Sequence, residues 1–314
     1  MLYFIVRRLL QTCVVIILVT VVVFAVMHSM PGNPVVMLLG PDASIEQIEY
    51  FTRMFGLDQP LVVQYGKWIG NLAHGEFGKS IAYRSNIGPM MQKRFLVTLT
   101  IALPAFSLAV LLGVSMGVVA AMRRGKLADS IITVTANIGM ATPVFWLSIV
   151  CVYFFSLKLK WLPVQGFTWP SENFPLALKK MIMPVCILAL GPMASFARQT
   201  RSSMLEVIRQ DYIRTARSKG LKENNVIFRH ALRNAMIPIV TLMGMQLGYM
   251  IGGSVLIEQV YVIPGMGNML ITAILNKDYL LVQSTVFVIA TGVSLCNLAV
   301  DIAYGYIDPR IRIS

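Results

Sequence analysis

The chain has 314 residues, of which 56% are hydrophobic and 13% are charged. That composition is far too apolar for an ordinary water-soluble domain, so the sequence predicts an all-α integral membrane protein. The formal net charge of +13 would suit nucleic acid, but the basic residues stand beside apolar runs rather than on a soluble module. Composition and charge together argue against a soluble enzyme and against a nucleic-acid binder.

The first apolar run, residues 9–30, follows two arginines and is long enough to cross about 30 Å of hydrocarbon as a helix. It is longer than the apolar core of a signal peptide and has no small-residue cleavage site. We therefore expect a retained transmembrane anchor over residues 1–30 with a cytoplasmic N-terminus. A Pro-Gly-x-Pro stretch at 31–34 should end this helix.

Residues 31–94 are too polar to span and are expected to form an excursion on the outer face, with helices at 44–55 and 60–72. Glycines recur here as they do in turns. No G-x-x-x-x-G-K-[ST] string occurs anywhere in the chain, so it lacks a phosphate-binding loop for ATP. Any work powered by ATP must come from another subunit.

Five further apolar runs complete a set of six predicted spans. They lie at 95–122, 131–157, 181–197, 235–257 and 282–305. The termini and short connections on one side hold sixteen Lys and Arg residues, against five on the other, and the positive-inside bias places that richer side in the cytoplasm. This predicts a five-span core at 95–305, a cytoplasmic loop at 198–234 and a cytoplasmic tail at 306–314.

Prolines and glycines indicate helices that are bent and closely packed. Prolines within the predicted spans are Pro104, Pro143, Pro184, Pro192 and Pro238. Gly113 and Gly117 have the four-residue spacing of a GxxxG pair, as do Gly244, Gly248 and Gly252. Tight packing inside one bundle and a moving gate both explain these residues.

Ionisable side chains are almost absent from the predicted spans. Glu258 lies at the outer end of the fifth span and Asp301 near the end of the sixth, and no carboxylate–basic pair is visible. This disfavours an ion-coupled carrier. No two of the three histidines share a helix at i, i+4 spacing, and the four cysteines have no C-x-x-C spacing, so no metal site and no catalytic residue is predicted.

Polar residues in the third and fifth spans are candidates for lining a wet translocation pathway. They are Asn137, Thr142, Ser148, Gln246, Tyr249 and Ser254. Each needs a hydrogen-bond partner in apolar surroundings, so hydrogen bonding between helices explains them equally well.

The polar segment after the fourth span predicts a short helix presented to another protein. Ser203 and Glu206 have the form of a capping box, which would start the helix. Gly220 would end it in the left-handed conformation that helix ends commonly require. Apolar and small residues recur between them at spacings of three and four, which makes the helix amphipathic. The alternative is an ordinary basic cytoplasmic loop, which needs none of these features.

Seven strings occur in order along nearly the whole chain. They are GLDQPLVVQYGKW (56–68), GEFGKS (75–80), YIRTARSKGL (212–221), HALRNAMIP (230–238), PGMG (264–267), KDYLLVQ (277–283) and DPRIR (308–312). Together they resemble the permease family of bacterial dipeptide, oligopeptide, glutathione and nickel ABC importers. RTARSKG (214–220) stands at the place of the EAA loop of such permeases, with Arg214 and Thr215 where Glu and the first Ala would be, and Pro238 lies later than the usual Leu-Pro. This form is typical of the peptide and nickel branch.

The resemblance implies a six-span permease of the type I ABC importer kind in the bacterial cytoplasmic (inner) membrane, surrounded by lipid. A second homologous permease would complete the translocation pathway, two separate ATP-binding subunits would bind ATP and Mg, and an extracytoplasmic solute-binding protein would deliver the solute. The chain itself would hold no cofactor and catalyse no reaction. Its contact with an ATPase would be made by Tyr212, Thr215, Ala216, Lys219, Gly220 and Leu221.

Short peptides are the expected substrate because they dominate the branch that the chain resembles, while nickel chelates and glutathione stay open. A stand-alone secondary carrier is an alternative of another class, and it would need intramembrane charges or inverted repeats. A membrane-embedded enzyme would need a nucleophile–base or carboxylate pair at membrane depth. Neither pattern is visible in the sequence.

Overall fold

The computed structural model describes residues 2–29, 34–40, 43–54, 56–80 and 82–307. In these ranges the chain is helical, and the extended pairing consists of one isolated antiparallel bridge between Lys79 and Asn86. Most of the predicted tail, with its DPRIR string, lies outside the described residues, as do three residues of the Pro-Gly-x-Pro stretch.

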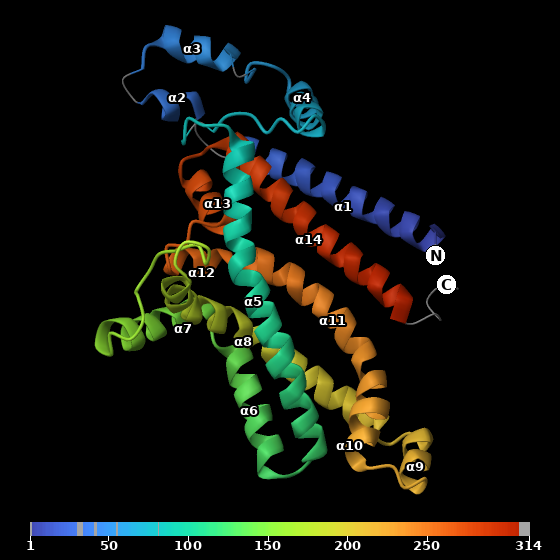
Figure 1. The fold of residues 1–314 in the computed structure, drawn as a ribbon. Coiled ribbons are helices and arrows are strands. Elements are labelled where there is room, and N and C mark those ends of the chain that lie inside the picture. Colours follow the sequence, from blue (N-terminus) through green and yellow to red (C-terminus); the bar gives the residue numbers. More distant parts are fainter. Residues whose placement is uncertain (1, 30–33, 41–42, 55, 81, 308–314) are drawn as a thin grey trace.

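The helices form one elongated bundle with a small helical layer at one end (Figure 1). In chain order they are α1 (Leu2–Ser29), α2 (Pro34–Leu39), α3 (Ile45–Met54), α4 (Leu61–Ala73), α5 (Ile87–Met122), α6 (Leu127–Ala141), α7 (Val144–Cys151), the π-helix η1 (Val152–Lys158), α8 (Phe174–Val207), α9 (Asp211–Ser218), α10 (Glu223–Asn225), the π-helix η2 (Val226–Ala231), α11 (Leu232–Gly253), α12 (Val255–Val260), α13 (Met266–Leu275) and α14 (Tyr279–Ile307).

In the part of the chain that the structure describes, five helical segments are long and apolar enough to cross a membrane. They are Ile5–Ser29, Ile87–Met122, Phe174–Val207, Glu223–Val260 and Tyr279–Val300. A sixth span exists only as a broken one, because the axis bends by 100° between α6 and the helix made by α7 and η1. The predicted span at 131–157 is therefore present only as this bent pair, and its interruption at Pro143 agrees with the expectation that prolines bend the spans. The break falls at Pro143, which lacks an N–H group and holds Thr142 in an extended conformation with ψ of 123°. The other four prolines lie inside continuous helices.

At the centre of the bundle, α5 and α8 approach each other closely at two glycines of α5, Gly113 and Gly117. A Cβ atom at Gly113 would lie 2.6 Å from the Met193 carbonyl oxygen, and one at Gly117 would lie 2.5 Å from Thr200 Cβ. Buried apolar side chains, including Ile101 on α5 and Phe196 on α8, continue this contact along both helices. For this glycine pair the explanation by tight packing is therefore confirmed.

The second glycine series lies between α11 and α14, and only part of it is closely packed. A Cβ atom at Gly244 would overlap Val300, and one at Gly248 would lie 3.0 Å from Val293 Cγ1. At Gly252 no atom lies within 4 Å of the corresponding position. α1 lies along the outer side of α14 (Figure 1).

The predicted excursion helices are confirmed as α3 and α4, although Phe55, the last residue of the first prediction, lies outside the described residues. α4 packs on the end of α1 through two polar contacts. Thr20 Oγ1 lies 3.0 Å from the Tyr65 hydroxyl, and His28 Nε2 lies 3.1 Å from Gln64 Oε1. The helical layer α2–α4 thus sits at the end of the bundle where α1 ends and α5 begins (Figure 1).

Two buried carboxylates hold the chain that leads into α13 and α14. Glu258 accepts hydrogen bonds from the hydroxyls of Thr98 (2.7 Å) and Ser254 (3.1 Å) and from the backbone N–H of Asn268 (2.9 Å). It thereby joins α5 and α12 to the first turn of α13. Asp278 accepts from the Ser80 hydroxyl at 2.6 Å and from the Leu281 backbone N–H at 3.2 Å, which ties the start of α14 to the segment before α5.

Candidate functional site

The predicted docking helix exists, but it begins later than the sequence indicated. Ser203 and Glu206 lie inside α8, which continues to Val207, so the predicted capping box is wrong. The Ser203 hydroxyl accepts a hydrogen bond from Gln199 Nε2 at 3.2 Å, and Met204 beside it is fully buried. Burial of this last part of α8 favours an uninterrupted helix. It outweighs the local preference of Ser203 and Glu206 for starting a new helix.

The helix predicted to be presented to another protein corresponds to α9, which follows a short turn after α8. Gln210 precedes it in an extended conformation with ψ of 149°, and no side chain caps the first turn. Asp211 stands at its first position, where a negative charge is favourable beside the positive end of the helix dipole.

The end of α9 has the predicted glycine geometry. Gly220 has φ of +73°, and its N–H group donates to the Arg217 carbonyl oxygen at 2.9 Å. Arg217 also donates to both Glu223 carboxylate oxygens, at 2.7 and 3.2 Å, which fixes the turn into α10. Its hydrogen bonds to this carboxylate raise the pKa of the Arg217 guanidinium.

One face of α9 is buried against the bundle. Ile213 and Ala216 point inward and form an apolar cluster with Met204 of α8, Val118 of α5 and Val226 of η2. The helix is therefore seated on three other elements, and a displacement of α9 would act directly on the ends of α5 and α8.

The other face of α9 and its C-terminal turn are open. Five of the six predicted contact residues are exposed here: Tyr212, Thr215, Lys219, Gly220 and Leu221. We call this set the coupling face. The sixth residue, Ala216, belongs to the buried side and supports the face from behind. α9 and α10 lie at the end of the bundle opposite to α2–α4 (Figure 1).

Large apolar groups on the coupling face are exposed beside basic ones. Tyr212 is 44% exposed, Leu221 is 41% exposed, and the Tyr212 hydroxyl accepts a hydrogen bond from Asn234 Nδ2 at 3.0 Å. Phe228 in η2 is 59% exposed and was not predicted. Its aromatic ring in an otherwise basic stretch is the sequence signal that could have indicated it.

An ion pair that the sequence analysis missed braces the region behind the coupling face. Arg201 Nε and Nη2 donate to Asp129 Oδ1 and Oδ2 at 2.6 and 2.8 Å, and the Gly125 N–H adds a third hydrogen bond at 3.0 Å. Asp129 lies near the start of α6 and Arg201 near the end of α8, outside the predicted spans 131–157 and 181–197. The pair therefore does not contradict the prediction that those spans lack a carboxylate–basic pair. It could not be predicted from the sequence because its partners are 72 residues apart and meet only in the folded chain.

The six candidate pathway residues are not brought together in the described structure. Ser148 and Ser254 are enclosed by this chain and donate to the carbonyl oxygens of Val144 (2.8 Å) and Ile251 (3.0 Å). The Thr142 hydroxyl donates in the same way to Ile138 O at 2.7 Å.

The remaining three candidates are more accessible. Asn137 and Tyr249 are exposed and Gln246 is half-buried. No hydrogen bond between described residues joins the third-span candidates to those of the fifth span. Ser148 and Ser254 thus face the interior of the bundle in this conformation, while the side chains of Asn137 and Tyr249 are exposed on its surface.

A metal-binding centre is not visible in the part of the chain that the structure describes. Its His, Cys, Asp and Glu residues include no group of three or more placed to hold a metal ion.

Comparison with known proteins assigns the family. Residues 1–102 match the family model for the N-terminal part of binding-protein-dependent transport system membrane components, and residues 113–313 match the model for the inner membrane component itself. The chain belongs to this permease family. It is 41% identical over 309 residues to a putative peptide transport system permease protein of Brucella abortus, with 98% of each chain covered. It is 37% identical over 312 residues to the oligopeptide transport system permease protein AppB of Bacillus subtilis, with 98% of this chain and 99% of that one covered.

The permease also resembles a solved structure, an inward-facing conformation of the MetNI methionine ABC transporter. The TM-score is 0.57, with 70% of this chain and 96% of that chain covered at 16% identity. At that identity the likeness concerns the fold alone. The predicted all-α fold of a type I ABC importer permease, a multi-pass protein of the inner membrane, is therefore confirmed, with the third span broken rather than continuous.

Proposed function

We propose that this permease forms half of the translocation pathway for short peptides in an ABC importer. The observation that carries the proposal is the coupling face, a short helix with a buried base and an open apolar and basic surface at one end of the bundle. The printed names of relatives that cover almost the whole chain supply the substrate class. Nickel chelates and glutathione are the alternative cargoes.

The coupling face would dock on an ATP-binding subunit. Tyr212 and Leu221 offer exposed apolar area whose burial stabilises a contact, and Lys219 can form a charge-assisted hydrogen bond with an acidic partner group. Gly220 lets the chain turn sharply without a Cβ atom between the two subunits. The seat of α9 on α5, α8 and η2 supports transfer of its motion to the bundle, as expected for alternating access.

The remaining partners follow from the same assignment. Two ATP-binding subunits would bind ATP and Mg, a second homologous permease would supply the other half of the pathway, and an extracytoplasmic binding protein would deliver the peptide. The coupling face and both termini would then be cytoplasmic and α2–α4 extracytoplasmic. The excess of basic residues on the α9 side supports this orientation.

Purification of the tagged chain from native membranes, followed by mass spectrometry and reconstitution, tests the proposal. We expect a second permease and one or two P-loop ATPases to co-purify, and reconstituted vesicles with the binding protein to take up dipeptides when ATP is present. Uptake of nickel chelates or glutathione but not of peptides would change the cargo. Recovery of this chain alone, with transport independent of ATP, would instead support a secondary carrier.

A further inference from the structure

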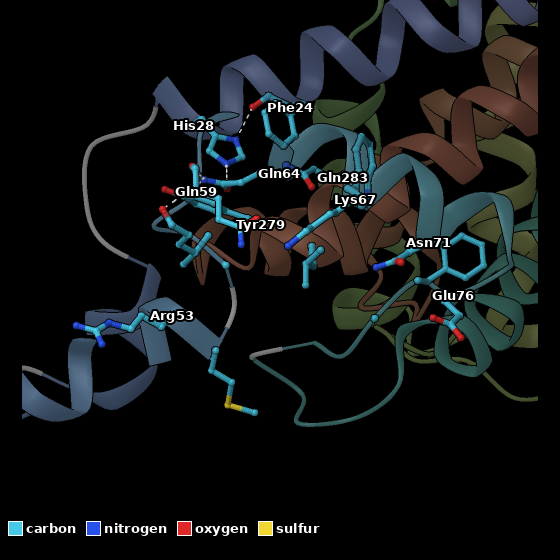
Figure 2. Close-up of a pocket in the computed structure, with 17 residues that line it drawn as sticks. Phe24, His28, Arg53, Gln59, Gln64, Lys67, Asn71, Glu76, Tyr279 and Gln283 are labelled. Atoms are coloured by element: carbon cyan, nitrogen blue, oxygen red, sulfur yellow. Dashed lines mark hydrogen bonds between the residues drawn. The ribbon is translucent and has the colours of Figure 1, made fainter. Parts of the chain in front are cut away.

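A cavity of about 340 Å³ lies between the end of α1, the helix α4 and the start of α14 (Figure 2). Its volume lies within the range of small-molecule sites, about 300–1,000 Å³. It belongs to the end of the bundle that carries α2–α4, away from the coupling face (Figure 1). Docking on an ATPase does not explain it.

One face of α4 forms a wall of this cavity. Gln64, Lys67, Trp68 and Asn71 all line it, and their spacing of three and four residues places them on one side of the helix. Gln64 is held in place because its Nε2 donates to the Gln59 carbonyl oxygen at 2.8 Å and its Oε1 contacts His28. The wall is therefore ordered before any ligand arrives.

Several buried polar groups of the cavity lining have unmet hydrogen-bonding capacity. Trp68 is only 6% exposed, and its indole Nε1 has no hydrogen-bond partner; Gln59 Oε1 is likewise buried without one. Gln283 on α14 is 3% exposed, and its side-chain amide makes no hydrogen bond with the described residues. The Trp68 and Gln59 atoms are enclosed by the protein in this conformation, so a ligand gains affinity from them only where these side chains turn to bond with it.

Two opposite charges stand on the same lining. Lys67 and Glu76 are both exposed, and no ion pair joins either one to another described residue. Arg53 points away from the cavity, whereas Lys67 extends into it (Figure 2). Both ring nitrogens of His28 are already engaged, by Phe24 O at 2.9 Å and by Gln64. Among the described lining residues, Lys67 and Glu76 thus offer a cation and an anion without an ion-pair partner, which suits a ligand that carries both charges.

The backbone positions of Lys67 and Glu76 indicate the least length of such a ligand, because the Lys67 side chain extends away from Asn71 (Figure 2). Asn71 lies four residues after Lys67, about 6 Å further along the helix axis. The Glu76 backbone N–H donates to the Asn71 carbonyl oxygen at 2.9 Å, so Glu76 lies just beyond this point. Two or three extended amino-acid residues span about 7–10 Å. We propose that the cavity is a second peptide site, which binds a dipeptide or tripeptide with its carboxylate at Lys67 and its ammonium group at Glu76.

This inference takes its ligand class from the proposed function, but it concerns a different site. The test uses the assembled transporter in nanodiscs without its binding protein, and the probe is radiolabelled dialanine. We expect saturable binding that weakens by about tenfold or more when the peptide is N-acetylated or C-amidated, because each change removes a charge-assisted contact.

Two variants assign the charges. Lys67→Gln should weaken dialanine binding and abolish its advantage over the C-amidated form, and Glu76→Gln should abolish its advantage over the N-acetylated form. Trp68→Phe keeps the ring but removes the indole N–H group, so weaker binding is expected there too. Lys179→Gln is the matched control, since Lys179 is an exposed lysine of α8 that does not line the cavity. This variant should bind dialanine with the same affinity as the native chain.

The outcomes separate this site from the proposed function. If dialanine does not bind, or binds equally to the Lys67 and Glu76 variants, while the complete importer still takes up peptides, the second site is refuted and the proposed function stands. Charge-dependent binding without peptide uptake would support the site and refute the import function. A phospholipid retained in native mass spectrometry and released by Lys67→Gln, without dialanine binding, would assign the cavity to lipid and overturn the inference.

Discussion

The Asp129 carboxylate and the Arg201 guanidinium form a two-pronged ion pair that joins the first turn of α6 to the last two turns of α8. Three residues after Arg201, Met204 enters the apolar cluster that seats α9. The pair therefore holds α6 against the part of α8 that leads into the seat of α9.

Removing either partner of this pair should destabilise the permease. The side chains of Asp129 and Arg201 are 8% and 31% exposed, so the remaining charge would be partly buried without compensation. We expect Asp129→Ala and Arg201→Ala each to lower the free energy of unfolding by about 2 kcal/mol, less than for a fully buried pair. Replacing both, as Asp129→Leu with Arg201→Met, should cost less than the sum of the single changes. Denaturant unfolding in detergent measures this.

The Arg217–Glu223 pair provides the control, because its side chains are 40% and 49% exposed. Arg217→Gln should lower the free energy of unfolding by less than about 1 kcal/mol, and the difference from the native chain should disappear in high salt. Strictly additive losses at Asp129 and Arg201 would show that their coupling is negligible.

Gly220→Val should separate ATP hydrolysis from transport. A β-branched residue at φ of +73° is strained by about 1–3 kcal/mol, although no neighbouring atom lies within 4 Å of the Cβ position. The turn after α9 would therefore change shape while the bundle stays intact. We expect normal membrane insertion, continued ATP hydrolysis and reduced peptide uptake in reconstituted vesicles. Gly220→Asn is the control, since Asn tolerates the left-handed conformation, and normal uptake by the Val variant would contradict the role of this turn.

Gly117→Ala should weaken the contact between α5 and α8. The new methyl group would lie 2.5 Å from Thr200 Cβ and 2.6 Å from the Ala197 carbonyl oxygen, so the two helices would have to separate. Overpacking of this kind costs about 1–3 kcal/mol, which thermal unfolding in detergent can detect. The same change at Gly252 meets no atom within 4 Å and should be neutral or slightly stabilising. Equal melting temperatures for the two variants would refute the assignment of Gly117 to close packing.

Glu258→Leu should disturb the junction of α5, α12 and α13. It would leave the Thr98 hydroxyl and the N–H group of Asn268 without their buried acceptor, at a cost of about 1–3 kcal/mol for each unmet group, whereas the Ser254 hydroxyl can still donate to the Ile251 carbonyl oxygen. Glu258→Gln should cost much less, because the amide oxygen can accept from the backbone while the hydroxyls turn to accept from its NH₂ group. Unfolding curves that rank the two variants equally would show that hydrogen bonding is not what Glu258 contributes.

Local patterns were sufficient for much of this fold. The apolar runs predicted the membrane spans, and the periodicity of the excursion predicted α3 and α4. Gly220 was correctly placed at a helix end because its left-handed conformation is a local requirement. The start of α9 could not be read in the same way. The Ser203–Glu206 pattern is locally sufficient for a cap, but the burial of Met204 favours a longer α8.

The class of the protein, the approximate places of its spans and the polar segment that carries the coupling face can all be predicted from the amino-acid sequence. These depend on composition, on helical periodicity and on residues that are neighbours in the chain. Which groups meet across long separations depends instead on how the helices pack. The Asp129–Arg201 pair, the hydrogen bonds of Glu258 and the cavity with Lys67 and Glu76 each join distant segments or depend on how those segments pack. The same holds for the 100° bend between α6 and α7, where Pro143 permits a break but its angle depends on the packing of the surrounding helices.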